Sequence, residues 1–324
     1  MQQLDVLCVG DGIIDAFLLL QHADEHSHEA DEGREFCFRL GAKIPVDDCQ
    51  FLLGGDASNV AVGLSRLGFT TALVAETGDD AFAHMITVGL EKEHVGLDFF
   101  KQTPNTPATF SVNIVFMQDR TILSRHVKRA HDLQFQSAQT KWVYLTSVGE
   151  EWKGLYQRVL EYVKEKNVKL AFNPGSHQLK EGRDSFMNVL HAADVVFVNR
   201  EEAEKIAYGT ERMTDGFNQP ETLLRELQKL GPKVVNITDG DQGSYAIDQT
   251  GKVYHQGILP GKFVQKTGVG DAYASGFLAS FMQDETDIQK AMLWGAGNAS
   301  AVIEHMGAQG GLLTKEQLIK RVML

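Results

Sequence analysis

Residues 267–271 read Thr-Gly-Val-Gly-Asp and lead into an apolar helical stripe. Gly268 and Gly270 leave the N–H groups around Val269 open. Such a turn at a helix start binds anions, because unpaired donors and the helix dipole converge there. An aspartate at this place is commonly an N-cap, but phosphoryl transfer needs a base for the hydroxyl proton beside donors for the transferred phosphate. We therefore predict a phosphoryl-transfer site with Asp271 as its base.

Two stretches resemble the signatures of the ribokinase-like, phosphofructokinase-B-type carbohydrate kinases. Residues 54–68, Gly-Gly-Asp-Ala-Ser-Asn-Val-Ala-Val-Gly-Leu-Ser-Arg-Leu-Gly, are similar to the first signature, and residues 267–278 are similar to the second. The two stand in the family's order and roughly two hundred residues apart, which makes the pair far more specific than either alone. The resemblance implies an α/β, ribokinase-like domain over residues 1–324, with a mainly parallel central sheet, helices on both faces and a small β-sheet lid.

In function, the resemblance implies an ATP-dependent kinase that transfers the γ-phosphate to a hydroxyl of a small sugar or sugar-like acceptor. Two alternatives stay open: a nucleoside kinase of the same fold, and a non-catalytic member that binds a sugar or a nucleotide. A dinucleotide-dependent oxidoreductase is a further rival, suggested by the glycines of residues 10–12. It is disfavoured because the third glycine position of that fingerprint holds Asp15.

The resemblance also places the nucleotide. Asn199 and Glu202 resemble the family's Asn-x-x-Glu motif, which organises Mg²⁺ and phosphate through water, so Glu202 is the expected Mg²⁺ residue. The alternative for this pair is a capping box at a helix start. Thr238, Gly240 and Gly243 resemble a Thr-x-Gly-x-x-Gly segment that lies along the nucleotide, although on its own this pattern indicates only a turn.

Two further positions on this side have open roles. Asn298 matches a position that borders the adenine in many relatives, and its alternative is a hydrogen-bonded asparagine of the core. Gln265 and Lys266 stand where many relatives have Asp-Thr, and that Asp often helps to bind an activating K⁺. The neutral glutamine leaves the dependence on K⁺ open, with Lys266 as another source of positive charge.

On the acceptor side, Asp15 stands where the family places an acidic residue that binds substrate hydroxyls. Gly54, Gly55 and Asn59 match the first signature, whose backbone and amide face the acceptor, and Asp56 replaces the Lys of several relatives. A carboxylate accepts hydrogen bonds from two adjacent hydroxyls, so this set suits a polyol such as a sugar or the ribose of a nucleoside. Asp56 could also cap the following helix.

A basic concentration stands out in this acidic chain: Arg120, Arg125, Lys128 and Arg129. In relatives the region lies beside the acceptor pocket, where an arginine would bind a carboxylate or phosphate of the substrate. The alternative is a solvated strand edge, protected by charge. Residues 129–131 read Arg-Ala-His where the family usually has Gly-Ala-Asn, which predicts an unusual acceptor preference.

The elements that position these residues follow from periodicity. Strand-like runs at residues 142–146, 168–172, 195–198 and 233–238 alternate with helical stretches, which predicts a mainly parallel sheet covered on both faces. Ligands then bind beyond the carboxyl ends of the strands. Helical spacing of apolar residues also predicts helices at residues 57–67 and 82–90, the second capped by Asp79 or Asp80.

Two segments break this rhythm. Residues 17–50 and 107–127 are expected to be inserted lid segments that pair as a small β-sheet. Within the first, residues 21–39 are dense in His, Asp and Glu, which favours a solvated loop, and residues 40–53 return to strand-like alternation. In the second, strands are expected at residues 109–116 and 121–124. Because the β lid of this family often pairs, the resemblance also implies a homodimer through the lid.

The composition and net charge of the chain exclude some classes of binding partner. The chain has 324 residues and a net charge of −12, which disfavours nucleic acid as a partner. Cys8, Cys37 and Cys49 show no metal-type spacing, and their odd number argues against a disulfide framework. We identify no signal peptide and no membrane span, so the cytoplasm is the expected location. The expected partners are therefore ATP and a small sugar-like acceptor.

Overall fold

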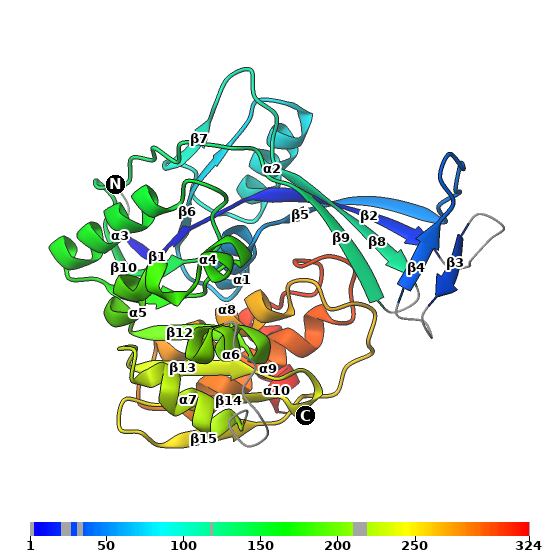
Figure 1. Cartoon of the computed structure of the whole chain (residues 1–324). Coiled ribbons are helices and arrows are strands. Elements are labelled where there is room, and N and C mark those ends of the chain that lie inside the picture. Colours follow the sequence, from blue (N-terminus) through cyan, green and yellow to red (C-terminus); the bar gives the residue numbers. More distant parts are fainter. Residues whose placement is uncertain (1–2, 21–26, 31–34, 117–118, 210–218, 324) are drawn as a thin grey trace.

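The computed structural model describes residues 3–20, 27–30, 35–116, 119–209 and 219–323. A large sheet of nine strands crosses the body of the molecule, and a smaller sheet projects from it (Figure 1). The large sheet runs β15–β14–β13–β12–β11–β10–β1–β6–β7, and all its neighbouring strands pair in parallel except at β14, which is antiparallel to both β13 and β15. Its strands are β1 (Leu4–Val9), β6 (Thr71–Thr77), β7 (Phe100–Gln102), β10 (Thr140–Leu145), β11 (Lys169–Phe172), β12 (Val195–Asn199), β13 (Val234–Thr238), β14 (Ser244–Ile247) and β15 (Val253–Gln256).

Helices cover both faces of this sheet because successive strand residues point to opposite sides. In β1, Val6 and Cys8 pack into one core while Leu7 and Val9 pack into the other. The first face carries α1 (Asp56–Arg66), α2 (Ala81–Lys92), α8 (Val269–Phe281), α9 (Ile288–Val302) and α10 (Lys315–Val322). The second carries α3 (Lys153–Lys166), α4 (Ser176–Glu181), η2 (Arg183–Phe186), α5 (Met187–Ala192), α6 (Arg200–Tyr208) and α7 (Pro220–Gln228). The expected sheet with helices on both faces is confirmed.

Local signals explain where several elements begin. The Asp80 side chain accepts a hydrogen bond from Ala83 N at 2.9 Å, so it is the predicted cap of α2. Tyr273, Phe277 and Phe281 stack along α8, as their spacing predicts. Gly276 lies where α8 faces α9: a Cβ there would approach Trp294 O to 2.6 Å, and its lack of a side chain lets α9 pack closely on α8. None of the described helices combines the length and apolarity that a membrane crossing requires.

The smaller sheet has the order β5–β2–β8–β9. Its strands are β2 (Ile13–Leu20), β5 (Asp48–Gly54), β8 (Phe110–Phe116) and β9 (Asp119–Arg125). The expected segments 17–50 and 107–127 supply most of it, but β2 begins before residue 17 and β5 ends after residue 50. The strands are longer at this end because Ile13 pairs with Gly54 at the junction with the body.

Two predictions for the intervening segment were wrong. Residues 21–39 are not a loop throughout, because β3 (Ser27–Ala30) and β4 (Glu35–Phe38) pair as an antiparallel hairpin. Phe36 of β4 stacks on Phe116 of β8 with ring centroids 4.0 Å apart, a contact that joins the hairpin to the smaller sheet. Residues 40–53 form a strand only from Asp48 onward. Parts of the predicted loop, residues 21–26 and 31–34, lie outside the described residues.

Candidate active site

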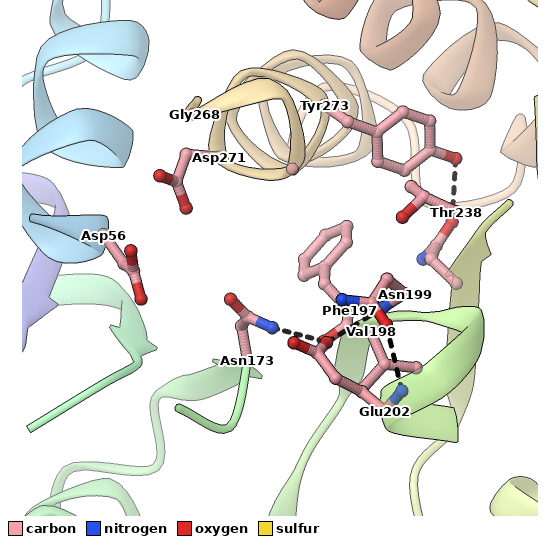
Figure 2. A pocket seen from close by; sticks show the side chains of 12 residues that line it. Asp56, Asn173, Phe197, Val198, Asn199, Glu202, Thr238, Gly268, Asp271 and Tyr273 are labelled. Carbon is pink, nitrogen blue, oxygen red and sulfur yellow. Dashed lines mark hydrogen bonds between the residues drawn. The ribbon is translucent and has the colours of Figure 1, made fainter. Parts of the chain in front are cut away.

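A cavity of about 200 Å³ opens where the carboxyl ends of β12 and β13 face the start of α8 (Figure 2). This is the edge of the sheet at which ligands of parallel α/β folds bind. The cavity joins residues from all three thirds of the chain. It is lined by Asp56, Asn173, Phe197, Val198, Asn199, Glu202, Asn236, Thr238, Gly268, Gly270, Asp271 and Tyr273.

Asp271 lies in the first turn of α8 and is 7% exposed. The helix begins at Val269 with Gly268 as its cap residue, so Asp271 is not the N-cap. Its Oδ2 instead accepts a hydrogen bond from Asn59 Nδ2 of α1 at 2.8 Å. Burial raises the pKa of Asp271 well above its ordinary value, and the nearby charge of Asp56 adds to this. The capping alternative therefore does not account for this carboxylate.

The turn before Asp271 has the form of an anion site. Gly268 has a φ of 75°, and a Cβ there would meet Ala308 Cβ at 2.3 Å, so this position requires glycine. The first intrahelical bond runs from Ala272 N to Gly268 O at 2.9 Å, which leaves the N–H groups of residues 269–271 without a partner inside the helix. A Cβ on Gly270 would meet no protein atom within 4 Å, although this residue lines the cavity. The cavity floor is thus open to the close approach of a ligand.

A chain of amides orients the partner of Asp271. Gln309 Nε2 donates to Asn59 Oδ1 at 2.9 Å, so the Asn59 amide must turn its nitrogen toward Asp271. Gln309 and Asn59 are both buried. The sequence offered no signal for Gln309, because this residue lies in neither signature. The predicted site residue Asn59 is thus a hydrogen-bond donor to the predicted base.

Asp15 lies on β2, where its side chain is buried beside β8. Ser111 Oγ donates to Asp15 Oδ1, and Asn113 Nδ2 donates to the same oxygen at 3.4 Å. Burial raises the pKa of Asp15, which these two donors partly offset. A Cβ on Gly54 would lie 2.1 Å from Asp15 Oδ2, so the glycine of the first signature makes room for this carboxylate. Ser111 and Asn113 were not predicted as site residues.

Asp56 is the first residue of α1, but Gly55 is the cap residue and no side-chain cap bond forms there. The Asp56 carboxylate points into the cavity across from Asp271 (Figure 2). Burial and the charge of Asp15 raise the pKa of Asp56 to about 6. Asp11, which the sequence did not single out, follows β1; burial and the charge of Asp56 raise its pKa to about 7.

The predicted basic residues do not converge on one anion site. Arg129 is buried and donates to Thr106 Oγ1 at 3.2 Å and to Pro107 O at 2.5 Å, so it holds a loop. Arg120 is half-buried, and its charge lowers the pKa of Asp15. Lys128 forms an ion pair at the surface, and Arg125 is exposed. Two of the four act on acceptor-side carboxylates through their charge, Arg120 on Asp15 and Arg129 on Asp11.

On the nucleotide side, Asn199 and Glu202 form the capping box that was the alternative for this motif. Asn199 Oδ1 accepts from Glu202 N, and Glu202 Oε2 accepts from Asn199 N, both at 2.9 Å. Both residues nevertheless line the cavity. Burial and the charge of Asp56 raise the pKa of Glu202 to about 7, although its bond from the Asn199 backbone opposes this. The capping geometry and a place in the site therefore coexist.

Thr238 ends β13 and lines the cavity, and η3 (Gly240–Gln242) with Gly243 follows as a tight turn. Arg200 Nη1 bonds Asp239 Oδ2 at 2.7 Å and so joins this turn to the start of α6. Five further lining residues were not predicted: Asn173, Phe197, Val198, Asn236 and Tyr273. Asn173 Nδ2 donates to Phe197 O at 2.8 Å, and Tyr273 Oη donates to Asn236 Oδ1 at 3.2 Å, as Figure 2 shows.

Asn298 does not line the cavity. It is fully buried in α9, and its Nδ2 donates to Ala272 O at 3.0 Å and to Ser275 Oγ at 3.1 Å. Its Oδ1 accepts from Leu313 N at 3.0 Å. Asn298 is thus a hydrogen-bonded asparagine of the core, which was the alternative to a residue that borders the adenine. Contact with an adenine stays a prediction.

Comparisons with known proteins agree with this geometry. The family model described as pfkB family carbohydrate kinase matches residues 31–315. The chain is 24% identical to the probable fructokinase-6, chloroplastic, of Arabidopsis thaliana, over 81% of this chain and 72% of that protein. It is also 24% identical to 5-dehydro-2-deoxygluconokinase of Lacticaseibacillus casei, over 98% of this chain and 95% of that protein.

The fold has known neighbours as well. The structure of Arabidopsis thaliana ribokinase complexed with ribose and ATP matches with a TM-score of 0.78 and 21% identity, and the match covers 100% of both chains. This likeness confirms the ribokinase-like fold. Since the family model spans most of the chain, the chain belongs to the pfkB family of carbohydrate kinases and is an ATP-dependent enzyme of that kind.

Proposed function

We propose that this enzyme transfers the γ-phosphate of ATP to a hydroxyl of a neutral polyhydroxy acceptor, with Asp271 as the general base. The observation that carries the proposal is the position of Asp271. Its carboxylate lies at the start of α8, directly after the glycine turn, and faces the cavity. A base and a set of phosphate donors thus meet at one helix end, as phosphoryl transfer requires.

In this mechanism Asp271 accepts the proton of the attacking hydroxyl. Burial raises the pKa of Asp271, and a carboxylate with a higher pKa is a stronger base than an exposed aspartate because it holds a proton more strongly. The amide of Asn59 holds the carboxylate in place through the 2.8 Å bond. The backbone N–H groups at Gly268, Val269 and Gly270 stabilise charge on the transferred phosphoryl group, the electrostatic contribution that usually dominates.

ATP would lie along the carboxyl ends of β12 and β13, with Asn199, Thr238, Gly240 and Gly243 beside it. The residues present also fit Mg²⁺. Glu202 is a carboxylate at the cavity, and burial raises its pKa to about 7 because it disfavours the ionised form. A divalent cation nearby would stabilise that ionised form. Mg²⁺ keeps several waters and binds few protein carboxylates directly, so Glu202 would hold it through water. When bound, the ion neutralises charge on the phosphates of ATP.

The charges of the acceptor side favour a neutral acceptor over a sugar acid or a sugar phosphate. Asp11, Asp15 and Asp56 gather there, and the charge of Asp56 raises the pKa of Asp11 while that of Asp15 raises the pKa of Asp56. Adding an anionic group would increase this repulsion, whereas hydroxyls can donate to every one of these oxygens. Arg120 and Arg129 supply opposing charges, but these already act on Asp15 and on Asp11, respectively.

The smaller sheet is proposed as the lid over the acceptor. Asp15 on β2 and Gly54 at the end of β5 place acceptor contacts at its base, where it joins the body. Closure of this sheet over the bound acceptor would exclude water and limit hydrolysis of ATP.

A second copy of the chain is the proposed partner of the smaller sheet. Phe51, Ile122 and Leu123 are 47%, 48% and 57% exposed there, and β9 is the edge strand of the described sheet. Pairing with another copy would cover both the apolar side chains and the open edge. The proposed location is the cytoplasm, which the free thiols of Cys8, Cys37 and Cys49 support.

The test is a coupled assay of ADP production with the purified enzyme and a panel of ketohexoses, aldopentoses, nucleosides, sugar acids and sugar phosphates. We expect turnover with a neutral acceptor, at a kcat/KM at least about tenfold above that for its acid or phosphate counterpart, a discrimination of about 1.4 kcal/mol. Preference for a nucleoside would make the enzyme a nucleoside kinase of the same fold. Preference for an acid or phosphate would refute the neutral acceptor, and no turnover with any acceptor despite ATP binding would favour a non-catalytic role.

A further inference from the structure

The segment just before the glycine turn holds a buried amide among main-chain carbonyls. Gln265 is 4% exposed. Its Nε2 lies 3.2 Å from Thr267 O, 2.9 Å from His305 O and 3.3 Å from Gly307 O. Its Oε1 accepts from Thr267 N. That N–H donor fixes the orientation of the amide, so the nitrogen and not the oxygen faces the three carbonyls.

Three carbonyl oxygens converging on one point form a site of negative potential. Such rings of carbonyls replace the hydration shell of a monovalent cation when the remaining ligands are also oxygens. An amide nitrogen has only two hydrogens for these three acceptors. The Gln265 nitrogen therefore occupies the point where the carbonyl dipoles meet, and it supplies partial positive charge in place of an ion. The residues present do not fit K⁺.

Lys266 does not supply the charge either. Its Nζ forms an ion pair with Asp119 of β9 at 3.0 Å, and its side chain is 56% exposed. This contact reaches to the smaller sheet and away from the three carbonyls. The expectation that Lys266 substitutes for a cation is therefore replaced by a role for Gln265.

The position of this amide matters because it ties together the two loops that shape the active turn. Thr267 belongs to the turn that leads into α8, whereas His305 and Gly307 follow α9. The second loop packs directly on the first, since a Cβ on Gly268 would meet Ala308 Cβ at 2.3 Å. Gln265 thus holds the turn whose N–H groups face the cavity.

We propose that Gln265 is a positioning residue that takes the place of a bound monovalent cation, so that this kinase works without K⁺. The proposal rests on the proposed function, because the turn it holds is the phosphate-facing turn of that mechanism. The proposal also predicts that a variant at this position would bind a monovalent cation. Gln265→Asp replaces the amide nitrogen by a carboxylate, which together with the three carbonyls supplies the all-oxygen shell that a cation requires.

The experiment compares wild type, Gln265→Asp and the control Gln283→Asp in buffers whose only monovalent cation is K⁺, Na⁺ or choline, at constant ionic strength. Gln283 is an exposed glutamine whose amide also donates to a carbonyl, Ala279 O at 2.8 Å. We expect the kcat of wild type and control to change less than about twofold between K⁺ and choline. The kcat of Gln265→Asp should fall at least about tenfold in choline and recover in K⁺.

Thermal melting of the same proteins without an acceptor gives a second reading that does not require turnover. K⁺ should raise the Tm of Gln265→Asp and leave that of wild type unchanged, because binding to the folded state alone stabilises it. A wild type that loses about tenfold in kcat or melts earlier in choline overturns the proposal, even if Gln265→Asp fails to fold. So does a folded Gln265→Asp that is indifferent to K⁺ in both readings. If no acceptor supports turnover, the proposed function fails while the melting curves still decide the role of Gln265.

Discussion

Single carboxylates carry the chemistry of this site, and burial changes what they can do. Asp271, Asp56 and Glu202 all have raised pKa values, with desolvation as the largest cause in each. Such values cluster at functional sites, because ordinary folding avoids burying like charges together. Here they mark a pocket in which several buried carboxylates lie close together. In the proposed function, hydroxyls of the acceptor and the cation that accompanies the nucleotide would stabilise these charges.

Replacing Asp271 by Asn tests the base. Asparagine keeps the shape of the side chain and an oxygen that can accept from Asn59, but it cannot take a proton. We expect kcat to fall by on the order of 10²–10⁴-fold, the usual contribution of a general base. The affinity for ATP, measured by calorimetry, should stay within about threefold, because the backbone donors remain.

Asp98→Asn, at an exposed aspartate on the surface, is the matched control for this change. It should leave both kcat and ATP affinity as in wild type. Near-normal turnover by Asp271→Asn would contradict the assignment of the base.

Replacing Asp56 by Asn tests whether the buried charge of Asp56 destabilises the folded protein, because the melting temperature of the variant should then depend on pH differently from that of wild type. The folded pKa of Asp56, about 6, lies above the ordinary value of 3.8. The folded state therefore holds the proton more tightly than the unfolded state, so this carboxylate costs stability as pH rises from about 4 to about 6. Without ligands, Asp56→Asn should gain Tm relative to wild type over this window and keep the gain at higher pH.

The measurement is a series of melting curves of the free enzyme from about pH 4 to about pH 8, a range that covers the window between the two pKa values of Asp56. Asp98→Asn again serves as the control, and its difference from wild type should not follow this trend. A difference between Asp56→Asn and wild type that shrinks as pH rises would show that the charge of Asp56 is already compensated.

At the scale of elements, the site depends on how α8 is held by its neighbours. Small residues such as Gly276 allow α9 to pack closely, and Asn298 of α9 bonds the first turns of α8 directly. The orientation of the helix end, and with it the direction of its free N–H groups, is therefore set by packing rather than by helix propensity. Asn298 therefore supports the site indirectly, because it holds the first turns of α8 in place.

Asn298→Ala tests this structural role. It removes the partners of Ala272 O, Ser275 Oγ and Leu313 N in a fully buried place. We expect the free energy of unfolding to fall by about 2–3 kcal/mol, because buried polar groups lose hydrogen bonds. Urea denaturation measures this loss, and the KM for ATP at low temperature should change less than about twofold.

The control for this variant is Asn188→Ala, an exposed asparagine in α5. A small loss of stability in Asn298→Ala combined with a large rise in the KM for ATP would instead support the predicted contact with the adenine.

At the scale of the whole molecule, each of the two sheets has its own part in the proposed site. In the proposed mechanism, the ends of β12 and β13 in the large sheet hold the nucleotide, and β2 and β5 of the smaller sheet hold the acceptor (Figure 1). The smaller sheet joins the body near Gly54, where β5 ends and α1 soon follows. Under this proposal the base and the phosphate donors lie on one helix, α8.

Leu123→Glu tests the proposed dimer. Leu123 is 57% exposed on β9, and a buried glutamate in a contact between copies would be strongly unfavourable. Light scattering after size exclusion should give about twice 35.8 kDa for wild type and close to 35.8 kDa for the variant.

Ile258→Glu is the control, because this isoleucine is 60% exposed but lies outside the smaller sheet. It should leave the mass as in wild type. A monomeric wild type at micromolar concentration would refute the dimer.

Sequence reasoning succeeded where the deciding residues are neighbours in the chain. The glycine turn and Asp271 stand within a few residues, so their place together at one cavity was predictable, and the alternation of strands and helices predicted the layers of the fold. It failed where position depends on distant contacts. Gln309 reaches Asn59 across 250 residues, and the hairpin of β3 and β4 packs on Phe116.

The sequence by itself indicated a carboxylate beside a glycine turn, through local spacing, and a layered α/β fold, through periodicity; the resemblance of its two signatures then indicated a kinase. The tertiary structure alone decided what each carboxylate touches. Asn59 meets Asp271 although 212 residues separate them, and Gln265 fills a ring of carbonyls drawn from two loops. These roles depend on burial and distance, which arise only when the folded chain excludes water and brings remote segments together.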